Sequence, residues 1–240
     1  MQNCDDEGVN IVLAPGYMLD RDLWADVENS LSAVGRLTYA DLSRDESIEA
    51  MASRLLDNAP AQIVLIGFSL GGYVAREAAR RAPHRVRAMV LIATSSRGDT
   101  EIQARRKATV AGASNVSKFT GLSRSAILSS LAPDHADDAM VARIRAMGDR
   151  LGGDVFERQS RLVRASDRDR LAEIECPTLV VAATEDRLRS LDEARELHSG
   201  IPRSTLVTIA GSGHMIPLEA PAALSEVIVA WLGKLMGPAR

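Results

Sequence analysis

Short runs of Val, Ile and Leu recur along the chain, and most are separated by stretches long enough to form a helix. The clearest runs cover residues 9–13, 62–66, 86–93, 178–183 and 205–209, with a weaker one at 36–40. Apolar and polar positions alternate poorly within them, which is typical of strands buried on both faces. The pattern therefore predicts a parallel sheet that helices cover on both sides.

The stretches between these runs place apolar residues at helical spacing. Helices are predicted over 45–58, 70–82, 191–198 and 222–236. Strand and helix alternate, and a strand–helix–strand unit almost always crosses over in the right-handed sense. We therefore expect an α/β protein with a doubly wound, mostly parallel sheet of about six strands.

Residues 97–170 interrupt this rhythm, because they contain no convincing strand and several helix-like pieces, such as 139–149 and 155–165. We predict a helical insertion, or cap, at 97–170 and a core formed by 1–96 together with 171–240. The insertion holds fourteen Lys or Arg against ten Asp or Glu, whereas the whole chain has a net charge of −3. A solvated surface explains this bias most simply, and a preference for anionic substrates is the alternative.

Composition narrows the possible partners. The chain has 240 residues, of which 46% are hydrophobic, 25% charged and only 3% aromatic, and it contains two cysteines. Few rings and no excess of positive charge argue against nucleic-acid binding. No apolar run is long enough to span a membrane, and two cysteines are too few for a disulfide framework or a zinc site. We expect a cytoplasmic monomer or homodimer with no nucleic-acid, membrane or metal partner.

The segment that carries candidate chemistry follows the run at 62–66. Residues 67–71 read Gly-Phe-Ser-Leu-Gly, which fits the pattern Gly-x-Ser-x-Gly, and a predicted helix begins at once. A serine held in a sharp strand-to-helix turn needs glycines beside it, because side chains there crowd the turn. Ser69 is then expected at the carboxyl end of the sheet, where open α/β sheets bind ligands. An ordinary glycine-rich turn is the alternative.

A serine becomes an effective nucleophile only when a base takes its proton. The chain has four histidines, and His214 lies just past the last predicted strand, within reach of the sheet end that carries Ser69. The other three, His84, His135 and His198, fall at positions typical of the surface. We therefore predict that His214 is the base.

A carboxylate must orient the imidazole and stabilise its charged form. Asp186 follows the run at 178–183, and its place in the chain gives the order Ser, acid, His. Its neighbour Glu185 and the earlier Asp99 are the alternatives. We predict Asp186 as the acid.

The oxyanion that forms during acyl transfer needs N–H donors. One predicted donor is the backbone N–H of Leu70, the residue after the candidate nucleophile. The second is expected from the loop after the first strand, where Gly16 permits close approach of the backbone; Tyr17 is the candidate and Met18 the alternative. The side chains expected in the substrate pocket, whose wall should be mainly aliphatic and Met, are those of Tyr17, Met18, Phe68 and Met215.

These motifs resemble those of the α/β-hydrolase superfamily over nearly the whole chain. Residues 67–72 resemble its nucleophile elbow, 183–186 its acid loop, and 213–221 its histidine loop with the helix that follows. The insertion at 97–170 is similar to the helical cap over the substrate pocket. The group most similar in character is that of small bacterial carboxylesterases, including pimeloyl-carrier-protein methyl ester esterases and enol-lactone hydrolases.

Two features depart from that family. Its oxyanion loop usually contains His-Gly, where this chain has Pro15-Gly16. Its sheet often begins with an antiparallel hairpin, for which the residues before the run at 9–13 leave little room. Since that His is not a member of the triad, we expect the backbone donor to survive the first change. The second departure leads us to expect about six strands, all parallel.

The resemblance implies a serine hydrolase that cleaves a small carboxylic ester, a lactone or a thioester through an acyl-enzyme, with no cofactor and no metal. A ligand-binding or signalling protein on the same fold, with little turnover, is the first alternative. A non-hydrolytic acyl transferase or lyase is the second.

Overall fold

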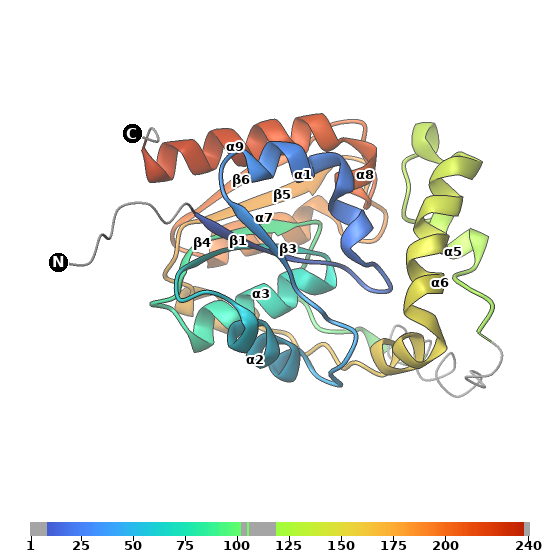
Figure 1. The fold of residues 1–240 in the computed structure, drawn as a ribbon, viewed down its shortest axis with the longest axis horizontal. Coiled ribbons are helices and arrows are strands. Elements are labelled where there is room, and N and C mark those ends of the chain that lie inside the picture. Colours follow the sequence, from blue (N-terminus) through green and yellow to red (C-terminus); the bar gives the residue numbers. More distant parts are fainter. Residues whose placement is uncertain (1–8, 102–104, 106–118, 238–240) are drawn as a thin grey trace.

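The structure, a computed structural model, describes residues 9–101, 105 and 119–237 (Figure 1). Its centre is a six-stranded sheet with the strand order β2-β1-β3-β4-β5-β6, and every neighbouring pair is parallel. The strands are β1 (Asn10–Ala14), β2 (Arg36–Tyr39), β3 (Ile63–Phe68), β4 (Val86–Ile92), β5 (Thr178–Ala183) and β6 (Ser204–Ile209). The predicted α/β sheet is thus confirmed.

Helices cover both faces of the sheet. They are α1 (Ala25–Ser32), α2 (Ile48–Asn58), α3 (Leu70–Arg81), α7 (Leu191–Gly200), α8 (Ile216–Glu219) and α9 (Pro221–Met236), with the short 3₁₀ helix η1 (Arg21–Trp24) before α1. In β1, Ile11 and Leu13 pack in a core cluster with α1 and α9, whereas Val12 and Ala14 pack with α2, α3 and α7. Successive strand residues face opposite sides, so a continuous apolar run serves both cores.

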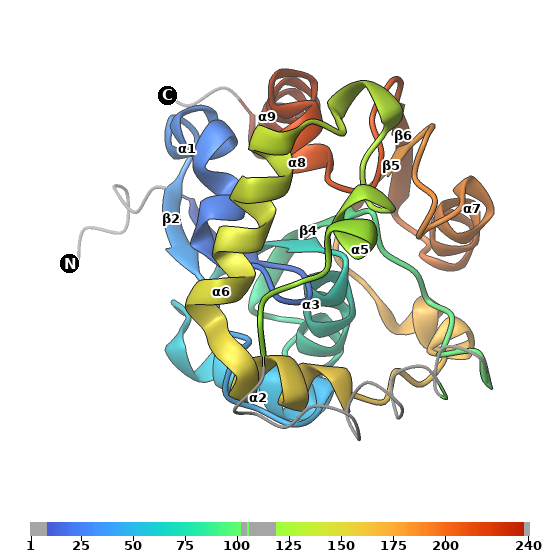
Figure 2. The ribbon, with the colours of Figure 1, turned by 90° about the vertical axis from the view of Figure 1, so that its right-hand side faces the viewer.

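The described part of residues 97–170 contains helices and no strand, and in the chain it follows β4 and precedes β5. It comprises α5 (Arg124–Leu128), the 3₁₀ turn η3 (Pro133–His135) and α6 (Asp138–Ser160), and η4 (Arg168–Glu173) leads back to the sheet. The helix-like pieces predicted at 139–149 and 155–165 belong to α6, which bends at Gly152 and ends at Ser160. Figure 2 shows α5 and α6 in front of one end of the sheet.

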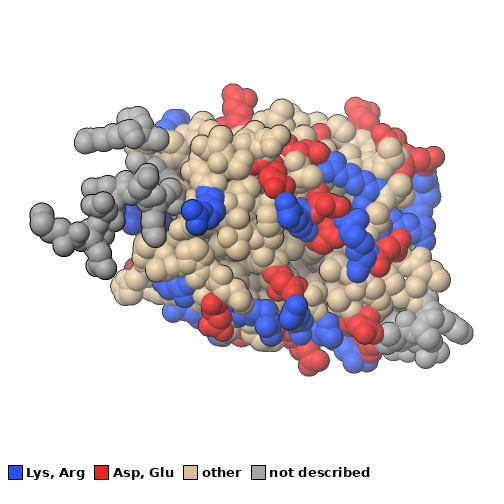
Figure 3. Space-filling view, in the orientation of Figure 1, with Lys and Arg blue, Asp and Glu red and all other residues tan. Residues whose placement is uncertain are grey.

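The basic side chains of α6 meet acidic side chains of the core. Arg150 pairs with Asp20 at 2.7 Å and with Asp22, and Arg143 pairs with Asp26. Figure 3 shows positive and negative side chains interleaved on this face of the molecule. Exposed pairs of this kind contribute little individually, at most about 1 kcal/mol. The positive excess of the insertion is therefore matched, at least here, by negative charge on the core beside it.

The two ends of the insertion are hydrogen-bonded to each other beside α3. The N–H of Asp99 donates to the carbonyl of Arg164 at 2.9 Å, and the N–H of Asp167 donates to the carbonyl of Ser96 at 3.0 Å. The Arg164 guanidinium also binds the Asp99 carboxylate. Asp99, the alternative candidate for the acid, is therefore engaged in joining the two ends of the insertion.

Asp167 forms a buried ion pair with α3. Arg76 donates to its two oxygens at 2.8 and 3.0 Å, and Arg80 donates at 2.9 Å. The Arg76 side chain is 0% exposed and that of Asp167 12%. Burial by itself raises the pKa of a carboxyl group, but the attraction of Arg76 and the hydrogen bonds from both arginines outweigh it and hold the pKa of Asp167 below its usual range.

We expect Asp167→Asn to lower the free energy of unfolding by about 3–5 kcal/mol near neutral pH, because it leaves Arg76 buried without its carboxylate. The depressed pKa means that this stabilisation is complete above the unfolded-state pKa of about 3.9 and is lost as the pH falls through the folded-state value. Urea unfolding across the acid range measures both effects. If wild type and variant lost stability equally as the pH falls, Asp167 would not be the source of the loss of stability in acid.

Candidate active site

Ser69 occupies the turn between β3 and α3 with φ 50° and ψ −108°. A positive φ is strained for a residue with a side chain and persists only where the surroundings enforce it. A Cβ on Gly67 would lie 2.4 Å from the carbonyl oxygen of Gly71, and one on Gly71 would lie 2.1 Å from that of Ala14. Both positions therefore require glycine, and the segment forms the sharp turn that its sequence predicts.

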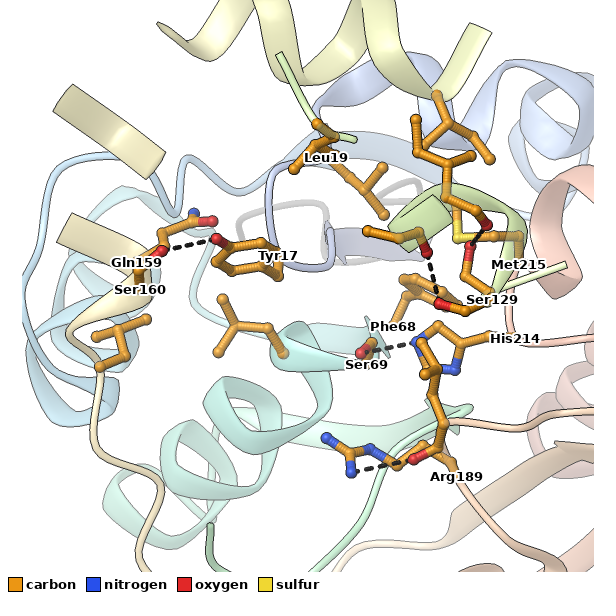
Figure 4. Close-up of a pocket in the computed structure, with 18 of the residues that line it drawn as sticks. Tyr17, Leu19, Phe68, Ser69, Ser129, Gln159, Ser160, Arg189, His214 and Met215 are labelled. Atoms are coloured by element: carbon orange, nitrogen blue, oxygen red, sulfur yellow. Dashed lines mark hydrogen bonds between the residues drawn. The ribbon is translucent and has the colours of Figure 1, made fainter. Parts of the chain in front are cut away.

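His214 lies between Ser69 and Asp186, and Figure 4 shows its contact with Ser69. Its Nε2 lies 3.0 Å from Ser69 Oγ, and its Nδ1 lies 2.8 Å from Asp186 Oδ2. The side chains of His214 and Asp186 are 7% and 1% exposed. The three residues follow β6, β3 and β5, so the parallel sheet brings their loops to one edge. The structure thus places the predicted nucleophile, base and acid in one hydrogen-bonded chain.

The loop after β5 fixes the orientation of Asp186. Its Oδ1 accepts the backbone N–H groups of Leu188 and Arg189 at 2.7 and 2.9 Å, which leaves Oδ2 toward the imidazole. The alternative acid Glu185 is exposed. Among the other histidines, His84 is also exposed, and the exposed His198 lies 2.9 Å from the hydroxyl of Ser204. None of these groups shares the contact between His214 and Ser69.

The candidate oxyanion donors differ in their availability. The N–H of Met18 donates to Gln159 Oε1 at 2.8 Å, so this alternative donor is already used. Within the described ranges, no protein acceptor takes a hydrogen bond from the N–H of Tyr17 or Leu70. A Cβ on Gly16 would lie 2.9 Å from the Phe68 ring, which explains the glycine in this loop. Tyr17 and Leu70 remain the predicted donors.

A cavity of about 450 Å³ adjoins Ser69 and His214. The core contributes Tyr17, Leu19, Phe68, Ser69, Leu70, Leu188, Arg189, His214 and Met215 to its wall, and the insertion contributes Leu122, Ala126, Ile127, Ser129, Ser130, Ile144, Gln159, Ser160, Leu162 and Arg164. Leu and Ile side chains predominate among the apolar residues, in keeping with the expected, mainly aliphatic wall, and Met215 is the one Met among these lining residues. The hydroxyl and amide groups of the insertion were not predicted.

Met18 does not line this cavity, which corrects the expectation that it does. Its side chain is 0% exposed, and its φ of 53° is left-handed. A left-handed residue reverses the direction of the loop, so two neighbouring side chains need not face the same space. Tyr17 faces the cavity, and Met18 is packed inside the protein.

The last turn of α6 holds the loop that carries Tyr17, a role that the sequence pattern did not indicate. The amide of Gln159, which accepts from Met18, also donates to the carbonyl of Leu42 at 3.0 Å. The hydroxyls of Tyr17 and Ser160 lie 2.7 Å apart. Burial raises the pKa of the Tyr17 hydroxyl, although its hydrogen bond with Ser160 opposes this. The sequence shows only that Gln159 and Ser160 are polar residues near a helix end. Which groups they bind depends on tertiary packing, so their role could not be predicted.

Two further kinds of site are absent from the described ranges. No group of three or more His, Cys, Asp or Glu residues there is placed to hold a metal ion. No helix in this part of the chain is long and apolar enough to cross a membrane.

Comparison with known proteins gives a family and several relatives. A family model described as alpha/beta hydrolase fold matches residues 35–221. A pimeloyl-[acyl-carrier protein] methyl ester esterase of Photobacterium profundum is 36% identical over 99 residues, which make up 38% of this chain and 39% of that esterase. The matched stretch thus spans well under half of the curated relative.

Solved structures match over nearly the full chain. A thermophilic esterase from Thermogutta terrifontis superimposes with a TM-score of 0.83 at 25% identity, covering 96% of this chain and 92% of that one. The enol-lactonase from Burkholderia xenovorans LB400 superimposes with a TM-score of 0.83 at 20% identity, covering 94% and 92%. At 20% identity, the match to the enol-lactonase shows a shared fold and nothing more.

Proposed function

Because the chain belongs to the alpha/beta hydrolase fold family, we propose that it is a serine hydrolase that cleaves a small carboxylic ester. The observation that carries the proposal is the chain of contacts from Ser69 Oγ through His214 to the buried Asp186. The likeness to an esterase of 25% identity over most of both chains supports the same reaction class. A lactone or thioester is attacked in the same way.

In the proposed mechanism, Ser69 Oγ attacks the acyl carbon while His214 Nε2 accepts its proton. Asp186 stabilises the imidazolium and keeps Nδ1 protonated. The N–H groups of Leu70 and Tyr17 hold the oxyanion of the tetrahedral intermediate. His214 then gives the proton to the leaving alcohol, which departs from an acyl-enzyme on Ser69. Water repeats the sequence, releasing the acid and restoring the serine.

We further propose that residues 97–170 act as a cap that shapes the substrate pocket. The described part of this insertion supplies about half of the cavity wall, including Ile127 and Ile144. Two polar anchors, Gln159 and Ser160, connect it to the oxyanion loop. The acyl or alcohol group that fits is therefore selected by the insertion, whereas the core residues carry the chemistry.

A substrate panel tests the reaction class. We expect hydrolysis of p-nitrophenyl esters, with a preference among acyl chain lengths set by the cavity of about 450 Å³. Thioesters and lactones assayed beside them define the leaving group. Saturable binding of such compounds with no turnover would instead support a ligand-binding protein, and transfer of the acyl group to an added alcohol in preference to water would support a transferase.

A further inference from the structure

A buried carboxylate lies behind the histidine loop. Glu219, the last residue of α8, is 6% exposed. Its Oε2 accepts the N–H of Gly213 at 3.0 Å, and its Oε1 accepts the N–H of Met215 at 2.8 Å. These two residues flank His214 in the chain. One side chain thus holds the backbone on both sides of the proposed base.

The same carboxylate binds the insertion. Its Oε2 also accepts the N–H of Ala132 at 2.8 Å. The N–H of His214 itself donates to the carbonyl of Ser130 at 2.9 Å, and Ser130 lines the cavity. A Cβ on Gly213 would lie 2.4 Å from the backbone nitrogen of Ala132, so the two backbones are in direct contact. Segment 130–132 and the histidine loop are therefore joined as one unit.

The chemistry of this contact requires a carboxylate. All three partners of Glu219 are donors, and a carboxylate accepts at both oxygens without bringing a donor of its own. An amide in its place turns an NH₂ group toward at least one backbone N–H, which leaves that donor unsatisfied. Burying an ionisable side chain is costly unless it is fully hydrogen-bonded. The three bonds meet that condition.

We propose that Glu219 is a positioning residue, which keeps His214 Nε2 at hydrogen-bond distance from Ser69 and couples that position to the cavity wall at 130–132. This inference rests on the proposed role of His214 as the base. It has a consequence for selectivity: a substrate that displaces segment 130–132 also moves the base. Such a substrate loses turnover even where it still binds.

The test compares Glu219→Gln with two controls, using p-nitrophenyl butyrate as substrate. We expect Glu219→Gln to lower kcat by roughly 10–100-fold with KM unchanged, because a small displacement of a catalytic group has this effect on rate. Glu226→Gln makes the same change at an exposed position of α9 and should leave both constants unchanged. Leu55→Ala truncates the core on the α2 face, so it should lower the Tm but preserve kcat.

A second measurement separates this inference from the proposed function. The rate at which a fluorophosphonate labels Ser69 reports activation of the serine by His214 without any ester substrate. If the wild type reacts and Glu219→Gln reacts equally fast, or has the same kcat as the wild type, the proposed role of Glu219 is wrong but the proposed function stands. An unreactive wild type contradicts the proposed function and removes the basis of this inference.

If circular dichroism shows that Glu219→Gln is unfolded, Glu219→Asp takes its place. Its shorter carboxylate cannot span all three donors, so this variant should also lose kcat with KM unchanged.

Discussion

Replacing Ser69 by Ala is expected to lower the kcat of ester hydrolysis by about 10⁴–10⁶-fold. Within the described part of the chain, the Ser69 hydroxyl makes a single hydrogen bond, to His214 at 3.0 Å, so its removal takes away the nucleophile and little else. The thermal midpoint of unfolding should stay close to that of wild type. Progress curves at high enzyme concentration measure the residual rate.

The matched control for this variant is Ser32→Ala, which removes an exposed hydroxyl on α1 that donates to the carbonyl of Asn29. Its kcat should equal that of wild type. Ester hydrolysis that persists in Ser69→Ala at the rate of Ser32→Ala would mean that another residue carries the reaction.

Asp186→Asn is expected to lower kcat by about 10⁴-fold. Asp186 Oδ1 accepts two backbone N–H groups, so the oxygen of the new amide should take that place and its NH₂ should face His214 Nδ1. Nδ1 must then act as an acceptor, and the imidazole proton moves to Nε2. In that tautomer Nε2 donates to Ser69 and cannot take its proton.

The neighbouring Glu185→Gln variant separates the two candidate acids. Glu185 is exposed, and we expect its replacement to leave kcat unchanged. Steady-state kinetics of both variants with one ester give the comparison. A larger loss of kcat for Glu185→Gln than for Asp186→Asn would assign the acid role to Glu185 and contradict the proposed arrangement.

Much of the fold could be predicted because its inner strands β1, β3, β4 and β5 are largely buried on both faces. Such strands read as nearly uninterrupted apolar runs, and together with the partly exposed edge strand β6 they make five of the six strands clear in the sequence. The ends of helices were predicted less well. Apolar spacing predicted that α2 starts at residue 45, but it begins at Ile48, because the Ser47 side chain caps the helix by accepting the N–H of Ala50. Local hydrogen bonds rather than periodicity decide such ends.

The positions of Ser69, Asp186 and His214 could be predicted because each follows a strand, and parallel strands end at the same edge of the sheet. The cavity wall could not, because it depends on how the insertion packs. Gln159 binds Met18, Ser160 binds Tyr17, and Glu219 binds Ala132; partners so far away in the sequence leave no local pattern. Met18 was misplaced for a similar reason, since its left-handed φ is set by the loop as a whole.

The proposed mechanism requires that Ser69, with His214 as its base, forms a covalent acyl-enzyme. Rapid acid quenching during turnover of p-nitrophenyl butyrate, followed by peptide mass spectrometry, tests it most directly. We expect a butyryl group on the peptide that contains Ser69, and none on the same peptide of Ser69→Ala. Turnover with no acyl group on Ser69, or with the group on another residue, would contradict it.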